Sequence, residues 1–451
     1  MRKRPHITDP SEYTPCYSYH AAGHGTRALY CEGVSLARIA GAVGTPAYVY
    51  SRASIEAAYR RLDGAFGSLP HTICYAMKAN SNLSVLRVLA RLGSSFDVVS
   101  GGELDRLRRV GVPGSRIVFS GVGKTPEEIR AALRYGGKAS RRGGILLFNV
   151  ESGAELEVLL GEAARHVSTG GARPCAAIRV NPDVLAGGHP HIATGAHQHK
   201  FGVDWQQARQ LYLAHKDSRW IAWRGITSHL GSQIFSIAPY RRALTRLASF
   251  VRDLAGNGVR LEYIDIGGGL GIRYTDEAAL PAAAYANALA DIVRPLGCRL
   301  LIEPGRTLVG PSGVLLTRVL YLKENHGKAF VVVDAAMNDL IRPVLYGATH
   351  PITPAVRVSG VAARKSRVDV VGPVCESGDY LALDRDLVEP APGDLVALMS
   401  AGAYGAVQAG TYNTRALVPE VLVNGTEWAV VRPRVEVEEL IALDRLPAWL
   451  K

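Results

Sequence analysis

A lysine that follows a short apolar run is the first residue whose position suggests chemistry. Residues 71–80 read HTICYAMKAN, a run of strand type that contains Lys78 near its end. The segment 81–92 then carries leucines at helical spacing. A lysine between a strand and a helix lies where α/β barrels place their catalytic groups. A partly desolvated lysine there can lose its proton and form a Schiff base, whereas the plainer interpretation is a surface lysine at a strand end.

Other polar residues and glycines close further apolar runs. Glu303 stands in EPGR (303–306), His229 and Ser232 stand in HLGS (229–232), and GGGLG spans 267–271. A carboxylate at a barrel mouth could be an acid catalyst, a metal ligand or the partner of a cationic ring nitrogen. A Schiff-base lysine, an imidazole that stacks, glycines for a phosphate and a carboxylate for a pyridinium nitrogen together describe a pyridoxal phosphate site.

The elements that must position these residues alternate regularly. Eight short apolar runs are each followed by a helical pattern, which predicts parallel strands covered on both faces. Eight such units in about 250 residues match a (β/α)₈ barrel, with a doubly wound open sheet as the alternative. The polar or glycine endings favour the barrel, because they would converge on one mouth. The runs are 71–79, 95–100, 116–121, 145–150, 176–181, 223–230, 263–268 and 299–305.

The flanking segments have a different texture. Residues 1–26 form a polar, turn-rich extension that we expect to be loosely held. Residues 27–51 predict a strand, a helix over 36–43 and a strand over 45–51, and this last strand could join a second domain. We expect the barrel over 52–306 and a mostly β domain over 307–451, with a helix at 435–443. Its predicted strands are 313–322, 329–333, 368–371, 395–399 and 428–433.

Composition limits the classes of function. The chain has 451 residues, of which 47% are hydrophobic and 20% charged, as in an ordinary soluble globular protein. It has no apolar run of the roughly 20 residues that a membrane helix needs, and no apolar signal core follows its basic start. Six scattered cysteines suit a reducing compartment, so we expect a cytoplasmic protein. The net charge of +12 is spread along the chain, which favours an anionic small substrate over nucleic acid.

Three motif matches fail on closer reading. GVGKT (121–125) ends like a phosphate-binding P-loop, but Val118 stands where that motif needs glycine. GGGLG lacks the dinucleotide spacing because Ile272 stands at its last glycine position, although bare backbone N–H groups there suit one phosphate. Four histidines lie in a glycine-rich loop without helical spacing, so we expect no metal site: His189, His191, His197 and His199.

The chain resembles the barrel-type pyridoxal phosphate decarboxylases, and within them the diaminopimelate decarboxylase family. The resemblance runs from about Leu29 to about Leu443. The 1–26 extension and the histidine-rich loop 189–199 match none of its signatures. The motifs that carry it are TPAYVYS (45–51), YAMKAN (75–80), FDVVSGGEL (96–104), FSGVGKT (119–125), HLGSQ (229–233), DIGGGLG (265–271), EPGR (303–306), MNDLIRPVLYGA (337–348), GPVCESGD (372–379) and AGAYG (401–405).

This resemblance implies an alanine racemase-like architecture of barrel and β domain, and a reaction. The reaction is the pyridoxal phosphate-dependent decarboxylation of meso-2,6-diaminopimelate to L-lysine and CO2, the last step of lysine biosynthesis. It implies that Lys78 holds the cofactor as a Schiff base, that Glu303 faces its ring nitrogen and that His229 stacks on its ring. The remaining cofactor contacts would come from Ser232, Gly269, Gly305, Arg306 and Tyr404.

The resemblance also implies how the substrate is held. Cys375 would return a proton to Cα, although without its motif a small buried hydrophobic residue is the plainer interpretation. Arginine forks suit the distal carboxylate of the substrate. The implied substrate residues are Arg306, Arg342, Tyr346, Glu376 and Tyr404. The implied assembly is a homodimer in which each active site borrows the CESGD loop (375–379) from the partner.

Three alternatives remain open. The chain could decarboxylate a related amino acid, namely ornithine, lysine, arginine or carboxynorspermidine, but basic amino acids would leave Arg342 without a carboxylate. It could be a non-catalytic pyridoxal phosphate-binding barrel, which would need neither the second domain nor the CESGD loop. It could resemble an alanine racemase, which Glu303 disfavours, because an arginine at the ring nitrogen suits racemisation.

Overall fold

The computed structural model describes residues 13–136, 144–184, 200–358 and 365–450, which cluster into two compact units. One unit comprises Ala58–Gly271 and Ala278–Thr307. The other comprises the residues up to Ala57, the short piece Ile272–Glu277 and the residues from Leu308 onward. The predicted domain boundaries, after residues 51 and 306, stay predictions. The histidine-rich loop 189–199 lies outside the described residues.

The first unit is the expected eight-stranded barrel. Its strands follow one another around a closed parallel barrel, and the last strand, β12, pairs with the first, β5. All eight predicted runs therefore contain a barrel strand, and the barrel interpretation is confirmed over the open sheet. The strands are β5 (His71–Ala76), β6 (Ser95–Val98), β7 (Ile117–Phe119), β8 (Leu147–Val150), β9 (Cys175–Arg179), β10 (Ala222–Thr227), β11 (Tyr263–Asp265) and β12 (Arg299–Ile302).

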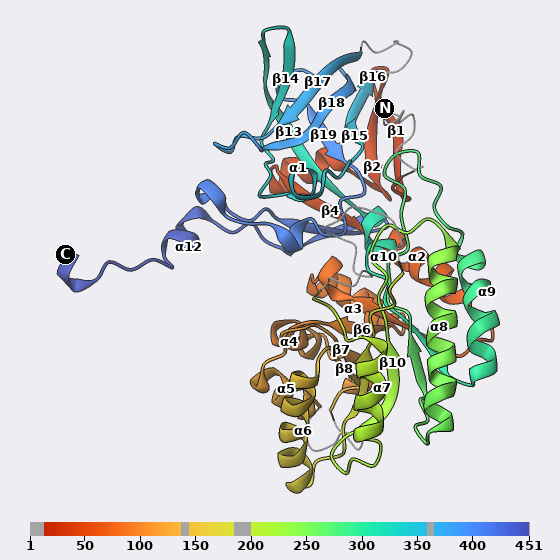
Figure 1. The fold of residues 1–451 in the computed structure, drawn as a ribbon. Helices are drawn as coiled ribbons and strands as arrows, with labels where there is room; N and C mark the ends of the chain where they lie inside the picture. Colours follow the sequence, from red (N-terminus) through yellow and green to blue (C-terminus); the bar gives the residue numbers. More distant parts are fainter. Residues whose placement is uncertain (1–12, 137–143, 185–199, 359–364, 451) are drawn as a thin grey trace. The chain divides into compact units, whose positions relative to one another are not determined.

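Helices surround these strands (Figure 1), and most begin at a side-chain cap. Ser100, Ser152 and Asp204 each accept a hydrogen bond from the backbone N–H three residues later, and Thr125 forms a capping box with Glu128. Each such cap stabilises a helix by about 1 kcal/mol and fixes where the preceding loop ends. The helices are α2 (Arg52–Ala65), α3 (Leu83–Arg91), α4 (Gly101–Arg109), α5 (Pro126–Leu133), α6 (Gly153–Ser168), α7 (Trp205–Ala214), α8 (Ile237–Gly256), α9 (Ala282–Val293) and α10 (Arg306–Val309).

The barrel interior explains why its strands read as apolar runs. Small and branched side chains from five strands meet in one fully buried cluster, made of Cys74, Val118, Leu147, Ala177 and Leu301. Strands that are buried on both faces have no solvent side on which polar residues could alternate. The interior is therefore a packed core, and polar groups can collect only at the strand ends.

The second unit is built on a nine-stranded sheet. Its main path runs β18-β17-β14-β13-β4-β20-β21, and β19 pairs with β13 and β15. Strand β4 (Ala47–Ser51) pairs with β13 and β20, so the strand predicted over 45–51 does join the β domain. The other members are β13 (Gly313–Asn325), β14 (Lys328–Val333), β15 (Ile352–Pro354), β17 (Lys365–Val371), β18 (Tyr380–Val388), β19 (Leu395–Leu398), β20 (Glu420–Asn424) and β21 (Glu427–Arg432).

The expectation that residues 1–26 are loosely held is wrong for the part that is described. Strand β1 (Tyr17–Gly23) pairs with β2 (Thr26–Cys31), which also pairs with β3 (Val34–Ser35) and β16 (Val356–Val358). The Tyr17 side chain is fully buried, and its hydroxyl donates to the carbonyl oxygens of Val49 at 2.7 Å and Ser312 at 3.1 Å. Such long-range bonds anchor a segment whose own sequence looks polar.

Short helices complete the second unit. The predicted helix over 36–43 is α1 (Leu36–Val43), and the one near the C-terminus is α12 (Val437–Ile441). Helix α11 (Arg342–Tyr346) and strands β15, β16, β18 and β20 were not predicted. None of the described helices combines the length and apolar character that a membrane span requires.

Candidate active site

Lys78 lies on a rigid turn at the barrel mouth. The turn is the 3₁₀ segment Met77–Ala79 directly after β5, and both neighbours of Lys78 are buried. The Tyr75 hydroxyl donates to the carbonyl oxygen of Asn80 at 2.9 Å, and this hydrogen bond holds the end of the turn against β5. The Lys78 side chain is 42% exposed, and its Nζ lies 3.8 Å from Oδ2 of the buried Asp97 on β6. The amine is thus presented to the mouth beside a carboxylate.

The other lysine in a barrel signature, Lys124, is placed very differently. Its side chain is fully buried, and Nζ donates to the Glu155 carboxylate at 2.7 Å. The same amine donates to the carbonyl oxygens of Gly121 at 2.7 Å and Asn149 at 2.8 Å. The three acceptors lie on the segment after β7, on β8 and on α6, so this ammonium joins three neighbouring parts of the barrel. Lys124 therefore has a structural position, whereas the Lys78 side chain is 42% exposed and accessible to a cofactor.

Two buried carboxyl groups lie at the ends of neighbouring strands. Glu303 follows β12 and Asp265 ends β11, and both side chains are buried. Burial, followed by the neighbouring Asp265 and Asp97, raises the pKa of Glu303 well above its usual range. Burial also raises the pKa of Asp265 to about 6, while hydrogen bonds from the Gly267 N–H and from Glu303 oppose the rise. Burial and the neighbouring carboxyl groups therefore favour the protonated form of Glu303 as long as no cationic group faces it.

His229, directly beyond β10, is held as a neutral ring. The backbone N–H of Gly268 donates to His229 Nδ1 at 3.2 Å, so Nδ1 is the unprotonated nitrogen and Nε2 carries the hydrogen. Burial lowers the pKa of His229 well below its usual range, and the positive charges of Lys78 and Arg179 lower it further. A neutral, flat imidazole beside the lysine can stack on an aromatic ring without adding positive charge.

The glycine turn 267–271 is needed for close packing as well as for its N–H groups. Gly269 has φ of +99°, and a Cβ there would lie 2.5 Å from the carbonyl oxygen of Gly231. A Cβ on Gly268 would lie 2.1 Å from the carbonyl oxygen of Glu303. Three N–H groups of the turn already donate within the protein, to Asp265, His229 and Ile234. The expectation of bare N–H groups at this turn is therefore wrong for these three groups.

Ser232 and Arg306 meet beside this turn. Arg306 Nη2 donates to Ser232 Oγ at 3.0 Å, and the neighbouring Thr307 hydroxyl donates to the carbonyl oxygen of Leu270 at 2.8 Å. The Cβ of a residue replacing Gly305 would come within 2.9 Å of Ala79 Cβ, so only glycine lets the EPGR segment approach the lysine turn. A guanidinium, a hydroxyl and a glycine turn together form a cradle suited to a phosphate group.

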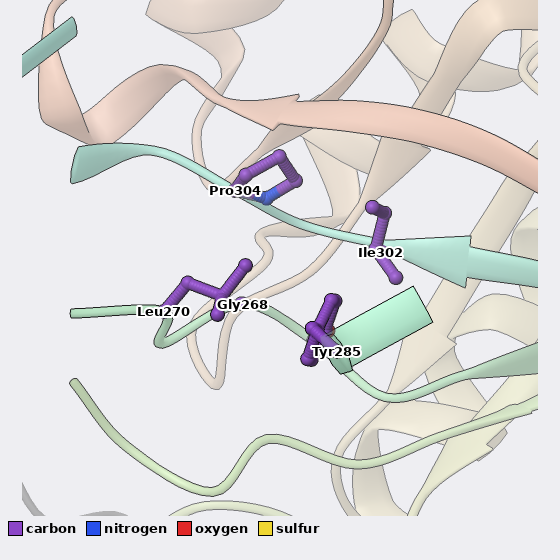
Figure 2. A pocket seen from close by; sticks show the side chains of 6 residues that line it. Gly268, Leu270, Tyr285, Ile302 and Pro304 are labelled. Carbon is purple, nitrogen blue, oxygen red and sulfur yellow. The ribbon is translucent and has the colours of Figure 1, made fainter. Parts of the chain in front are cut away.

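A narrow crevice lies behind the glycine turn (Figure 2). It is too narrow to admit a water molecule and is walled by Gly267, Gly268, Leu270, Tyr285, Ile302 and Pro304. Figure 2 shows Gly268 and Leu270 on the turn, facing Ile302 and Pro304 of the β12 segment. Its side chains are apolar apart from the Tyr285 hydroxyl, and Lys78 is not among them. A crevice this narrow and apolar cannot hold a cofactor or an amino acid. The candidate active site is therefore the polar barrel mouth around Lys78.

The remaining predicted residues lie in the second unit. Cys375 and Glu376 are exposed on the CESGD loop, which Asp379 ties down by accepting from the N–H groups of Met337 at 2.7 Å and Val374 at 2.6 Å. Tyr404 has a left-handed backbone with φ of +57°, a strained conformation for a non-glycine residue that is common at functional sites.

Helix α11 carries two more of the predicted residues. Arg342 begins the helix and is buried, and Tyr346 ends it and is partly buried. These positions stand four residues apart and so lie on one side of the helix. The predicted site residues are thus divided between the two units. The barrel unit holds residues 78, 229, 232, 269, 303, 305 and 306, and the β unit holds residues 342, 346, 375, 376 and 404.

Several site residues were missed by sequence reasoning. Asp97 and Asp265 stand inside the apolar runs SFDVVS and YIDIGG, where an isolated carboxylate was the available signal. Glu151 and Arg179, at the ends of β8 and β9, form a buried ion pair of 2.9 Å. Nothing local marks that pair, because its members are 28 residues apart. Among the described residues no group of three or more His, Cys, Asp or Glu could hold a metal ion, and the four histidines of the 189–199 loop lie outside them.

The residues present fit pyridoxal phosphate. The Oε1 atom of Glu303 is buried and has no hydrogen-bond partner among the described residues. Such an atom costs free energy unless a ligand hydrogen bonds to it, and a protonated ring nitrogen would do so. Lys78 offers an amine for the aldehyde, His229 a flat neutral ring, and Ser232 with Arg306 a place for the phosphate.

Comparisons with known proteins identify the family of this chain. Residues 52–310 match the family model described as "Pyridoxal-dependent decarboxylase, pyridoxal binding domain". Diaminopimelate decarboxylase from Pseudomonas aeruginosa is 48% identical over 418 residues, which cover 93% of this chain and 97% of that protein. The crystal structure of diaminopimelate decarboxylase from Helicobacter pylori in complex with L-lysine has a TM-score of 0.83 at 38% identity, covering 90% of this chain and 98% of that one.

A second solved structure extends the agreement over nearly the whole length. Diaminopimelate decarboxylase from M. jannaschii, also in complex with L-lysine, has a TM-score of 0.86 at 33% identity and covers 96% of this chain and 98% of that one. The family model spans more than half of the chain, and the relatives named here each cover at least 90% of the chain. The resemblance inferred from the motifs is confirmed, and this chain belongs to the diaminopimelate decarboxylases, a family of pyridoxal phosphate-dependent enzymes.

Proposed function

We propose that this chain decarboxylates meso-2,6-diaminopimelate to L-lysine and CO2, the last step of lysine biosynthesis. The observation that carries the proposal is that Lys78 and the buried Glu303, whose Oε1 lacks a hydrogen-bond partner among the described residues, both follow strands at the mouth of one barrel. The chain that holds them covers 97% of a diaminopimelate decarboxylase at 48% identity. Substrate and product fix the stereochemistry. A meso compound has one D and one L head, and the product keeps the L head, so CO2 leaves the D head.

The barrel residues would hold the cofactor and tune it. When bound, pyridoxal phosphate supplies an electron sink for the electrons of a broken bond at Cα. Lys78 binds the aldehyde carbon, and Asp97, 3.8 Å from its Nζ, orients the amine. Glu303 accepts a hydrogen bond from the ring nitrogen and keeps that nitrogen protonated. His229 stacks on the ring, while Ser232, Gly269, Gly305 and Arg306 hold the phosphate, with Tyr404 closing the site.

The β-domain residues would handle the substrate. Arg342, with Arg306 and Tyr346, binds the carboxylate of the distal L head, since a guanidinium fork matches a carboxylate through two parallel hydrogen bonds. Glu376 binds the distal ammonium group. Cys375 delivers a proton to Cα after the bond to the carboxylate breaks and CO2 leaves. The exposure of Cys375 and Glu376 on a loop fixed by Asp379 supports roles at a site rather than in a core.

The active form would be a homodimer whose sites are shared across a two-fold interface. Exposed apolar side chains support an interface, because contiguous apolar surface is typical of association sites. The C-terminal segment carries six of them, each 45–81% exposed: Val437, Ile441, Leu443, Leu446, Trp449 and Leu450. In this arrangement the CESGD loop of one subunit completes the partner's barrel mouth.

We also assign the enzyme to the cytoplasm. All six cysteines are free, and three of them, Cys31, Cys74 and Cys298, are buried as thiols. Free buried thiols suit a reducing compartment. The metabolic role, synthesis of an amino acid, is consistent with this location.

One assay tests the proposed function. The holoenzyme is supplied with meso-diaminopimelate, L-lysine or L-ornithine, and released CO2 is measured. We expect release from meso-diaminopimelate alone, together with accumulation of L-lysine. Preferential release from L-ornithine or L-lysine would reassign the chain to decarboxylation of a basic amino acid and leave Arg342 without its proposed role.

A further inference from the structure

A buried histidine in the β unit, His350, contacts Arg342. Under the proposed function, Arg342 is the residue that binds the distal carboxylate of the substrate. Arg342 begins helix α11 and is 5% exposed. Its Nη1 lies 2.6 Å from Nε2 of His350, which is 1% exposed. Neither the motifs nor the family resemblance assigned His350 a role. A buried polar contact to a functional arginine calls for a physical account.

The hydrogen bonds of His350 fix its protonation. His350 Nδ1 lies 2.9 Å from the carbonyl oxygen of Met399, and a carbonyl can only accept, so Nδ1 carries the hydrogen. The guanidinium of Arg342 can only donate, so Nε2 of His350 must be the unprotonated acceptor. His350 is thus a neutral ring in one defined tautomer. Its ring joins the backbone carbonyl of Met399 to one edge of the Arg342 guanidinium through two hydrogen bonds.

The surroundings hold this arrangement rigidly. His350 stands two residues before β15, which pairs with β19, and the Met399 N–H donates to the carbonyl oxygen of the intervening Pro351 at 2.7 Å. The Tyr274 ring lies 4.9 Å from the Arg342 guanidinium carbon and 5.2 Å from the His350 ring, at 78° to the latter. Tyr274 comes from Ile272–Glu277, the piece that clusters with the β unit although barrel residues flank it in sequence. Three chain segments therefore converge on one guanidinium.

We propose that His350 is a positioning residue that orients Arg342 and so sets the preference for a substrate with a distal carboxylate. This rests on the proposed function, in which Arg342 binds that carboxylate. A guanidinium is a planar fork, so fixing one edge and one face also fixes the direction of its remaining donors. An arginine without this brace would sample other rotamers and bind the carboxylate less well, while the chemistry at the barrel mouth continued.

Two conservative substitutions separate positioning from mere packing. A glutamine at 350 can place its amide oxygen where Nε2 stands and still accept from Arg342. An asparagine can place its amide nitrogen where Nδ1 stands and still donate to Met399, but it cannot reach Arg342. We expect His350→Asn to raise the KM for meso-diaminopimelate roughly tenfold or more with kcat little changed, the effect of losing a hydrogen bond to a charged group. His350→Gln should stay within about threefold of wild type.

D-lysine is the control ligand, because it equals meso-diaminopimelate without the distal carboxylate. Its inhibition constant should be the same in wild type, His350→Asn and His350→Gln holoenzymes. Equal effects of the two substitutions on KM, a loss confined to kcat, or an equal change in D-lysine inhibition would each overturn the positioning role. If neither variant folds, Tyr274→Leu replaces them, and an unchanged KM for meso-diaminopimelate in that variant would equally overturn the proposal.

Arg342→Gln separates this inference from the proposed function. If it leaves the KM for meso-diaminopimelate unchanged, Arg342 does not bind the distal carboxylate, and the role of His350 fails with it, while the turnover of meso-diaminopimelate keeps the proposed function in place. If Arg342→Gln raises KM and His350→Asn does not, the substrate assignment stands and only the role of His350 fails. A rise in KM in both, with no further rise in the double variant, is the result expected of two residues that act as one unit.

Discussion

Replacing Glu303 by glutamine tests the central electrostatic feature of the site. The substitution keeps the shape of the side chain and removes its ability to become a carboxylate. In the barrel, Glu303 is 7% exposed and lies beside the equally buried Asp265, so little water is available to substitute for a lost charge. The contact at stake is a hydrogen bond, in a site with little water, to a ring nitrogen that carries charge during the reaction. Losing such a contact raises the activation free energy by about 3 kcal/mol, which lowers turnover roughly 10²-fold.

The assay compares turnover with cofactor content. Glu303→Gln should retain bound pyridoxal phosphate, because Lys78 and the Ser232–Arg306 cradle are untouched, while kcat for meso-diaminopimelate falls roughly 10²-fold or more. Glu162→Gln is the matched control. It removes another buried barrel carboxylate, one that pairs with Arg165 and Arg130 on the helical layer, and it should leave kcat close to wild type.

Two results would refute the reasoning. Near-normal turnover in Glu303→Gln with cofactor bound would mean that no ring-nitrogen contact limits the reaction. A loss of turnover of the same size in Glu162→Gln would mean that the effect comes from disturbing the barrel. Loss of cofactor in Glu303→Gln, by contrast, would transfer the role of Glu303 from tuning the ring to binding it.

Three further predictions concern the lysine, the interface and a buried acid. Lys78→Ala should lose the borohydride-trapped cofactor adduct, whereas Lys328→Ala, at a surface ion pair, should keep it; an adduct that survives in Lys78→Ala would mean another lysine. Cys375→Ala and Lys78→Ala proteins should each be nearly inactive, and random subunit exchange between equal amounts should restore roughly a quarter of wild-type activity, because half the dimers then hold one intact site; exchange without recovery would place both residues in one chain's site. Burial raises the pKa of Asp339 to about 6, so between about pH 4 and pH 6 the folded state binds more protons than the unfolded state and the free energy of unfolding falls as pH rises. Asp339→Asn should therefore gain more in thermal midpoint over wild type at pH 8 than at pH 5, and equal gains would contradict this.

The barrel could be predicted because its signal is local and repeated. Each strand is a run of apolar residues that is buried on both faces, so no knowledge of its neighbours was needed to recognise it. Strand β18 was missed for the opposite reason. The strand contains exposed charged residues such as Asp384 and Asp386, which interrupt any apolar run. It is a strand because it pairs with β17. The anchoring of Tyr17 depends on Val49 and Ser312, which are 32 and 295 residues away.

The candidate site likewise contains residues that local sequence patterns predict and residues whose positions depend on distant contacts. Lys78, His229 and Glu303 stand at strand ends, where the barrel pattern alone predicts that side chains converge. The structural position of Lys124 could not be read from its motif, since it depends on Glu155 of α6 and on the carbonyl oxygen of Asn149 in β8, which lie 31 and 25 residues away. The contact between Arg342 and His350 depends on how α11 and the segment before β15 pack, and eight residues of separation in sequence do not specify it.

Two histidines, one in each unit, show how the fold rather than the residue type sets the protonation state of an imidazole ring. His229 accepts from the Gly268 N–H and is surrounded by the positive charges of Lys78 and Arg179, so its pKa lies well below the usual range. His350 accepts from Arg342 and donates to a carbonyl oxygen. Each ring has a backbone group on one nitrogen that dictates the tautomer, and protonating either would place a hydrogen against an existing donor. The enzyme therefore uses histidine here for its flat shape and acceptor nitrogen, and an acid limb in its pH–rate profile at the ordinary histidine pKa would be inconsistent with a stacked, neutral His229.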